Sequence, residues 1–174
     1  MSKENADKEQ KRSFKREVFS WIACIVVTIL LTEFILNFVI INANIPSGSM
    51  ENTIMTNDKL IALRTSYWFN DPKRGDIIIF KYPDDETEWF IKRVIALPGE
   101  TVLVKDGKVY INGSKKALSE PYIKEEPVED FGPYKVPKNG YFVMGDNRNN
   151  SNDAREWETH YVSRDEVLRK AWFR

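Results

Sequence analysis

Residues 102–111 read Val-Leu-Val-Lys-Asp-Gly-Lys-Val-Tyr-Ile, and this stretch indicates the fold class most clearly. Asp106-Gly107 separates two runs rich in β-branched residues, and Asp-Gly between such runs is a strong signal for a β-hairpin. Similar short runs of β-branched and aromatic residues occur at 59–63, 76–80, 89–95 and 141–144. We therefore expect a mainly β fold, with a largely antiparallel sheet.

Two segments between or after these runs have a different composition. Residues 114–138 are rich in Pro, Glu and Lys, which predicts a surface excursion between strands. A short helix is expected from Ser163, because Ser-Arg-Asp-Glu matches the capping box that opens many helices.

The totals of the chain exclude several function classes. The 174 residues carry 26 basic and 26 acidic side chains, so the formal net charge is zero. Nucleic-acid binding through phosphates needs a basic excess, so we expect no nucleic-acid partner. One cysteine, Cys24, and one histidine, His160, are too few for a structural zinc site. We expect neither a metal nor a cofactor.

A single apolar segment, residues 18–41, precedes the β region. About 20 apolar residues span a bilayer as a helix, and the apolar core of a cleavable signal peptide is shorter, so the segment predicts an uncleaved transmembrane helix. Basic residues concentrate upstream of it. By the positive-inside rule we expect a cytoplasmic basic tail (1–17), a membrane anchor (18–41) and an extracytoplasmic domain (42–174).

Glu33 is the one charged residue inside this apolar segment, and Asn37 follows one turn later on the same helical face. An acidic residue within a membrane helix costs about 2.5–3.5 kcal/mol on insertion scales. One interpretation is a contact between this face and another membrane helix, such as that of a secretion translocase. The other is a protonated Glu33 without a partner.

Candidate chemistry lies in Ser47-Gly48-Ser49 and in Lys92. A serine hydroxyl needs a neighbouring base to become a nucleophile. His160 is the only histidine and lies among polar residues, which disfavours a Ser-His-Asp triad. Lys92 falls within an apolar run, and burial there would lower its pKa toward that of a usable base. Each feature also has a simpler interpretation, namely a strand lysine that faces water and an ordinary serine-rich turn.

Four blocks follow one another along the chain: Pro46-Ser47-Gly48-Ser49-Met50-Glu51, Arg74-Gly75-Asp76-Ile77-Ile78-Ile79-Phe80, Ile91-Lys92-Arg93-Val94-Ile95-Ala96-Leu97-Pro98-Gly99 and the stretch 143–155, VMGDNRNNSNDAR. In this order they resemble the type I signal peptidase family. The resemblance covers the chain from the anchor to Arg155, and a single anchor is similar to the short Gram-positive form. It implies a membrane-anchored serine endopeptidase that removes signal peptides from exported preproteins after small residues (Ala-x-Ala).

The resemblance also implies roles for the matching residues. Ser49 would be the nucleophile and Lys92 the general base. The Ser49 N–H and the Ser47 hydroxyl would form the oxyanion hole, and Ser151 would orient the Lys92 amine. The remaining matches are the supporting pairs Asp153 with Arg155 and Asp146 with Arg93, and the positions near substrate pockets, Ile45, Met50, Ile54, Phe90 and Ile91.

The chain departs from the family pattern at three positions. Asn52 stands where the family usually has proline, which makes the turn after Ser49 less rigid. Ala96 replaces a common glycine and Ala154 a common serine, and neither change removes a proposed catalytic group.

Two other functions stay open at the level of sequence. One is a non-catalytic accessory or chaperone homologue for surface-protein or pilus assembly, although such a relative would be expected to lose Ser49 or Lys92. The other is a self-cleaving Ser/Lys protease, which the anchor and the outside location disfavour. The expected partners are signal peptides of preproteins and the lipid bilayer, at a single-pass position in the cell membrane. Whether Tyr67-Trp68-Phe69 contacts that membrane or packs in the core is left open.

Overall fold

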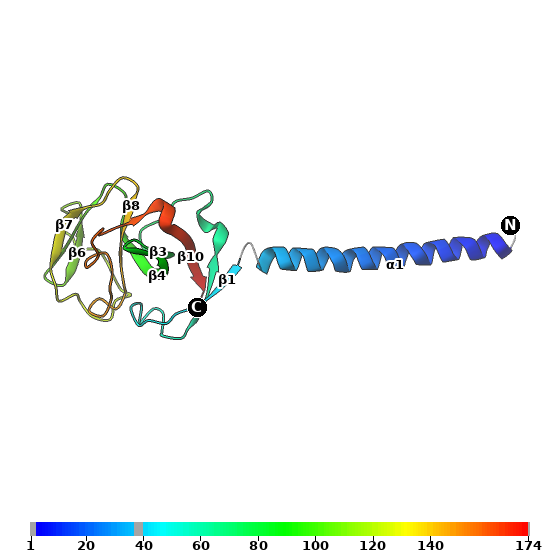
Figure 1. Cartoon of the computed structure of the whole chain (residues 1–174), viewed down its shortest axis with the longest axis horizontal. Coiled ribbons are helices and arrows are strands. Elements are labelled where there is room, and N and C mark those ends of the chain that lie inside the picture. Colours follow the sequence, from blue (N-terminus) through cyan, green and yellow to red (C-terminus); the bar gives the residue numbers. More distant parts are fainter. Residues whose placement is uncertain (1–2, 37–39, 174) are drawn as a thin grey trace. The chain divides into compact units, whose positions relative to one another are not determined.

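The computed structural model describes residues 3–36 and 40–173 in two units, which divide before Ile40 (Figure 1). The first unit is built on helix α1 (Lys3–Phe34), and the second is a β unit. The mainly antiparallel β fold and the single N-terminal apolar helix expected from the sequence are thereby confirmed.

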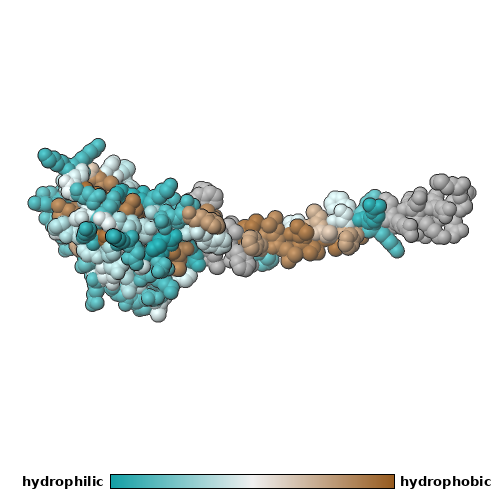
Figure 2. Space-filling view, turned by 90° about the horizontal axis from the view of Figure 1, so that it is seen from above, coloured by the Kyte–Doolittle hydropathy of each residue, from teal (hydrophilic) through white to brown (hydrophobic). Residues whose placement is uncertain are grey.

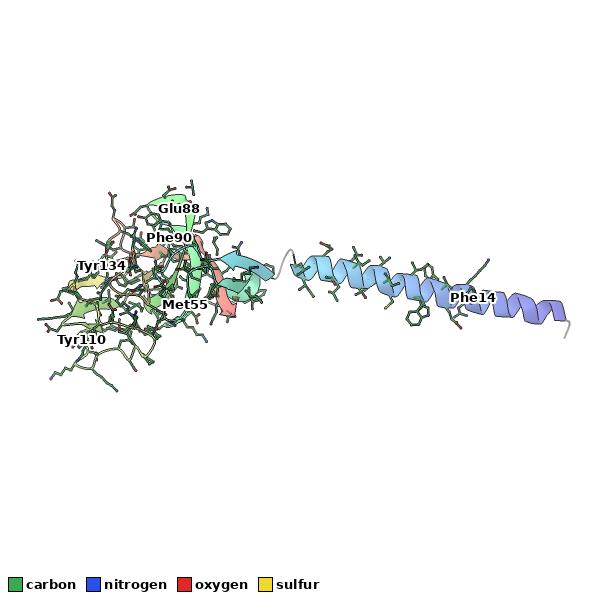
Figure 3. The ribbon with its side chains drawn as sticks, turned by 90° about the horizontal axis from the view of Figure 1, so that it is seen from below. Phe14, Met55, Glu88, Phe90, Tyr110 and Tyr134 are labelled. Atoms are coloured by element: carbon green, nitrogen blue, oxygen red, sulfur yellow. The ribbon has the colours of Figure 1, made fainter. Side chains whose placement is uncertain are left out.

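Within α1, the 21 residues Phe14–Phe34 have a mean hydropathy of 1.9. At about 1.5 Å per residue they extend about 30 Å, the thickness of a bilayer's hydrocarbon core. The apolar side chains are exposed along the helix, as the brown band in Figure 2 and the projecting Phe14 in Figure 3 illustrate. By length and composition this helix can cross a membrane.

The helix boundaries differ from the expected anchor of residues 18–41. The α-helix begins at Lys3, so the basic tail is helical too, since Lys, Glu and Ala favour helix. Ile40 and Ile41 belong to strand β1 (Ile40–Asn44) instead of the anchor. Hydropathy alone cannot separate the end of an apolar helix from an apolar strand, and pairing with β2 makes the difference. Asn37 lies outside the described residues.

A seven-stranded antiparallel sheet forms most of the β unit, in the order β1-β2-β10-β3-β4-β8-β9. Its remaining strands are β2 (Lys59–Leu63), β3 (Ile77–Tyr82), β4 (Asp85–Ala96), β8 (Gly140–Met144), β9 (Val162–Ser163) and β10 (Val167–Phe173). Two 3-10 turns, η2 (Arg64–Tyr67) and η3 (Arg164–Glu166), lie before β3 and β10. Ser163 therefore opens a single 3-10 turn and not the expected helix, because β10 pairs with β2 and β3 immediately afterwards.

A second sheet has three strands in the order β6-β5-β7. The predicted hairpin forms β5 (Thr101–Lys105) and β6 (Lys108–Ile111), and Asp106 and Gly107 both have positive φ, as a type I′ turn requires. Strand β7 (Phe131–Lys135) lies within the segment expected to be a surface excursion. Its pairing with β5 was not visible in the local composition, because residues distant in sequence supply the partner strand.

The main apolar core joins the two sheets. It includes Ile78 and Phe80 of the large sheet together with Val102 and Val104 of the small one. A smaller apolar cluster lies on the other face of the large sheet, near the chain that follows β1, and contains Ile45, Met50, Ile54, Leu60, Ala62, Ile79 and Ile91. Strand β4 contributes to both clusters, because successive side chains of a strand point to opposite faces.

Candidate active site

The serine loop, residues 45–50, connects β1 toward β2 and is held at both ends by buried apolar side chains. Ile45 is 4% exposed and Met50 is fully buried, both in the smaller cluster. Between them the chain carries Ser47, which is exposed, and Ser49, which is buried at 6% exposure. The two hydroxyl oxygens lie 3.3 Å apart. The loop thus presents two adjacent hydroxyl groups and is anchored by buried apolar side chains at both ends.

Lys92 lies in the middle of β4, opposite Ile78 of β3. Its side chain is 3% exposed, with Nζ 5.5 Å from the centre of the Phe90 ring. Burial lowers the pKa of its amine from the ordinary 10.5 to about 8, with a smaller opposing contribution from Asp153 and a lowering one from Arg155. The lysine faces the interior and not water, and a useful fraction of its amine is neutral near pH 7–8.

Ser47, Ser49 and Lys92 line one cleft of about 580 Å³. Its wall is completed by Ile45, Pro46, Gly48, Ile79, Glu88, Trp89, Phe90, Ile91, Asn150 and Asn152. Figure 3 labels Glu88 and Phe90, which both come from β4. Two hydroxyls, a buried amine and an apolar wall therefore share one solvent-connected space.

The 145–155 loop, which follows β8, holds the serine loop in place. The Asn147 backbone N–H donates to the Ser49 carbonyl at 3.1 Å, and its side-chain amide donates to the Gly48 carbonyl at 3.0 Å. Sequence reasoning gave Asn147 no role, although it lies within a recognised block. The available signal was its place in Gly145-Asp146-Asn147, directly after a buried strand. Its hydrogen-bond partners in the serine loop could not be predicted, because they lie almost a hundred residues earlier in the chain.

Ser151 lies in the same loop, next to the serine loop. Its hydroxyl is buried and, among the residues that the structure describes, has no hydrogen-bond partner. A Cβ atom at Gly145 would collide with both the Ser151 hydroxyl and the Ser49 carbonyl. Glycine at 145 is therefore what allows Ser151 to approach the backbone of Ser49.

Two buried ion pairs support these loops. Arg93 donates from Nε and Nη2 to the two Asp146 carboxylate oxygens, at 2.8 and 2.6 Å. Arg155 binds Asp153 in the same two-bonded manner, at 2.8 and 2.9 Å. Asp153 also accepts from the Gly145 N–H at 3.0 Å, so the second pair ties the loop to its own beginning. In the described part of the chain, no group of three or more His, Cys, Asp or Glu side chains could hold a metal ion.

The five positions expected near substrate pockets divide into two sets. Ile45, Phe90 and Ile91 line the cleft. Met50 and Ile54 do not line it, because their side chains are almost completely buried in the apolar cluster behind the serine loop. Cleft residues that sequence reasoning did not single out include Trp89, Asn150 and Asn152.

Comparisons with known proteins all give one family. The family model described as signal peptidase, peptidase S26, matches residues 18–174. The chain is 44% identical over 154 residues to probable signal peptidase I-2 of Synechocystis sp. (strain ATCC 27184 / PCC 6803 / Kazusa), covering 86% of this chain and 69% of that protein. It is 38% identical over 157 residues to signal peptidase I of Bacillus amyloliquefaciens, covering 84% of this chain and 82% of the relative.

A solved structure gives the same result. The crystal structure of a signal peptidase I from Enterococcus faecalis V583 has 35% sequence identity and a TM-score of 0.50, covering 58% of this chain and 97% of that chain. Sequence and fold thus point to one family. The chain belongs to the type I signal peptidase family, peptidase S26.

Proposed function

We propose that this chain removes signal peptides from exported preproteins with Ser49 as nucleophile and Lys92 as general base. Membership of the family makes the chain a serine protease of the signal peptidase I type. The observation that carries the assignment of residues is a buried Lys92, with its pKa lowered to about 8, in the same cleft as Ser49.

The reaction begins with a neutral Lys92 amine, which takes the proton from the Ser49 hydroxyl as its oxygen attacks the substrate carbonyl. At pH 7 a pKa of about 8 leaves about one amine in ten neutral. The Ser49 N–H and the Ser47 hydroxyl donate to the developing oxyanion. The protonated Lys92 gives its proton to the departing amine, and an ester-linked acyl-enzyme remains. Lys92 then activates water, which hydrolyses the ester and releases the signal peptide.

Ser151 orients the Lys92 amine in this proposal. The support is that its hydroxyl is buried, lies beside the Ser49 backbone and has no hydrogen-bond partner among the described residues. A buried hydroxyl without a partner is costly, and we assign it the Lys92 amine, which can both accept and donate a hydrogen bond, as its partner during the reaction. The pairs Asp153–Arg155 and Asp146–Arg93 hold the loop that carries it.

The apolar wall of the cleft favours small apolar side chains on the substrate. Ile45, Phe90 and Ile91 contribute apolar surface beside Ser49 and Lys92. A preprotein with Ala-x-Ala before the cleaved bond presents two small methyl groups to such a wall. Met50 and Ile54 support it from behind.

The helix α1 is consistent with membrane anchoring, and we propose that residues 1–17 lie in the cytoplasm and the β unit outside. The support is the excess of basic residues before the apolar stretch. A protease added outside intact spheroplasts should then digest the β unit and spare the basic tail. A contact between the Glu33 face and a translocase is the finer proposal, and crosslinking from the neighbouring Leu30 position tests it against crosslinking from Trp21.

The decisive experiment is cleavage of a preprotein with an Ala-x-Ala site by the full chain in detergent, with Ser49→Ala and Lys92→Ala as variants. Loss of cleavage in both, with unchanged circular dichroism, is the expected result. Activity of Lys92→Ala close to that of the wild type would contradict the lysine-base proposal. A wild-type chain that cleaves no member of a panel of signal peptides would favour the accessory role in surface assembly.

A further inference from the structure

The strap, residues 112–130 between β6 and β7, packs against the loops of the active site. Its composition predicts a solvated excursion, yet the Glu120 side chain is only 5% exposed and Pro127 is buried. A carboxylate that is taken out of water needs a strong compensating partner. The partner of Glu120 shows what the strap is attached to.

That partner is Arg148, in the 145–155 loop. The Arg148 side chain is completely buried and forms a two-bonded pair with Glu120, at 3.0 Å from Nη1 and 2.6 Å from Nη2. Its Nε donates to the Gly145 carbonyl at 3.0 Å, and its own carbonyl accepts from Arg155 at 2.7 Å. Glu120 therefore neutralises the cation around which the first half of this loop is folded.

Tyr122 makes a second attachment, to the residue that follows Lys92 in the chain. Its ring lies over the Arg93 guanidinium, with the carbon atom Cζ 3.9 Å from the ring centre. Its hydroxyl donates to Glu120 at 2.8 Å, so the two strap residues support each other. Stacking of a guanidinium on an aromatic ring is favourable, more so where water is excluded. The strap thus contacts β4 as well as the 145–155 loop.

Both ends of the strap are attached independently of these two residues. The Leu118 N–H donates to the Val109 carbonyl of β6 at 2.7 Å. Near the other end, the Val128 N–H donates to the Asn149 side chain at 3.0 Å, and that side chain donates to the Glu126 carbonyl at 3.1 Å. Because the ends are held, Glu120 and Tyr122 occupy defined positions against the 145–155 loop and β4.

We propose that Glu120 and Tyr122 are positioning residues, which act through Arg148 and Arg93 to hold the 145–155 loop and β4 in their reactive arrangement. The inference rests on the proposed roles of Ser49, Lys92 and Ser151. No strap residue is among the described residues that line the cleft, so substrate binding should be nearly unaffected. The chemical step should suffer, because a displacement of about 1 Å of a reacting group can cost about a hundredfold in rate.

The experiment measures kcat and KM for preprotein cleavage by the full chain in detergent. We expect Glu120→Ala to lower kcat about 10- to 100-fold and to change KM by less than about twofold. Tyr122→Leu should lower kcat by a smaller factor, whereas Tyr122→Phe, which keeps the ring over Arg93, should retain most of it. Glu129→Gln, an exposed change in the same strap, should equal the wild type.

Stability is controlled with Val104→Ala, a buried change in β5 away from these contacts. If Val104→Ala lowers Tm as much as Glu120→Ala and lowers kcat equally, the strap is merely structural and the proposal is overturned. An unchanged kcat in folded Glu120→Ala also overturns it. Because the two residues act as a pair, Glu120→Ala combined with Arg148→Ala should be no slower than Arg148→Ala alone. A further loss of kcat in the double variant would contradict action through Arg148.

These outcomes are separate from those that test the nucleophile and the base. Ser49→Ala and wild type, run in the same assay, decide whether this cleft performs the cleavage. If both behave as proposed and the Glu120 and Tyr122 variants equal the wild type, only the role of the strap is lost.

Discussion

Each face of β4 carries one buried basic side chain, and the two differ in whether a carboxylate binds them. On one face Lys92 is 3% exposed, and none of the ion pairs among the described residues involves it. On the other face Arg93 is 9% exposed and binds Asp146 through two hydrogen bonds. It also donates to the Gly75 carbonyl and lies under the ring of Tyr122.

The difference shows how one strand supports both structure and chemistry. A buried cation without a bound carboxylate loses its proton more easily, because burial disfavours the charged form. A buried guanidinium paired in two-bonded geometry remains charged and joins the segments around it. In the proposed mechanism Lys92 acts as a base, whereas its neighbour Arg93 holds the loop that begins at Gly145 through its ion pair with Asp146.

The largest expected effect is on the rate of cleavage. It comes from Lys92→Arg, which places an arginine on both faces of β4. Arginine keeps a cation in the cleft but cannot release its proton to act as a base. We expect cleavage of an Ala-x-Ala preprotein to fall about 10²- to 10⁴-fold, the range of general acid–base catalysis. The measurement is the initial rate of cleavage in detergent. Substantial activity in Lys92→Arg would mean that a positive charge suffices at this position.

The second prediction concerns the free energy of unfolding. Asp146→Ala removes the carboxylate that binds Arg93. Asp146 is completely buried, so its removal leaves a buried guanidinium without its counter-ion. Breaking such a pair from one side costs about 3–5 kcal/mol. Urea unfolding of the full chain measures it. The matched control is Asp71→Ala, whose pair with Arg164 is mostly exposed at Asp71 and should be worth less than about 1 kcal/mol.

A third prediction concerns how much the buried Lys92 amine lowers the free energy of unfolding. Its pKa is about 8 in the folded chain against an ordinary 10.5, so between these values the unfolded chain binds more protons and stability rises with pH. Below pH 8 the full cost of the buried charge is present, about 3 kcal/mol. Lys92→Met should therefore raise the unfolding free energy at pH 7 by up to about 3 kcal/mol. This gain should shrink toward pH 10.5. A gain that does not depend on pH would show that packing, and not charge, is responsible.

The fourth prediction is the pH dependence of cleavage. Since the proposed mechanism requires the neutral Lys92 amine, kcat/KM should rise with pH and level off above about 8. Below that value it should fall about tenfold per pH unit. His160→Asn should leave this fall of kcat/KM at low pH, the acid limb of the profile, unchanged. Asparagine suits the positive φ of 55° at that position. Disappearance of the limb in His160→Asn would contradict Lys92 as the titrating group.

The smallest expected effect lies in the turn after Ser49. Asn52 has a φ of 88°, in a region that glycine adopts freely and asparagine tolerates, so the proline usual at this position in the family does not fit this backbone. Asn52→Gly should change the unfolding free energy by less than about 1 kcal/mol, whereas Asn52→Ala should lower it by about 1–2 kcal/mol. Equal stabilities of the two variants would show that the turn relaxes to negative φ.

Local sequence was sufficient for the strands that carry their own signals. The hairpin of β5 and β6 was expected because Asp106-Gly107 supplies both positive φ angles between two β-branched runs. Strand β7 was not expected, because its composition resembles a loop and its partner β5 is supplied from a distance in the chain. Strand β10 was missed for the same reason, since its pairing with β2 and β3 overrides the capping signal at Ser163.

The candidate site divides in the same way. Motif resemblance in the sequence alone marked Ser49, Lys92 and Ser151, and an apolar run marked the helix that is long enough to cross a membrane, because these signals are local. Only the tertiary structure decided that Lys92 faces inward, that Met50 supports the cleft from behind and that Glu120 is buried on Arg148. Burial and ion pairing depend on which distant segments pack together, and the composition of a single segment does not contain that information.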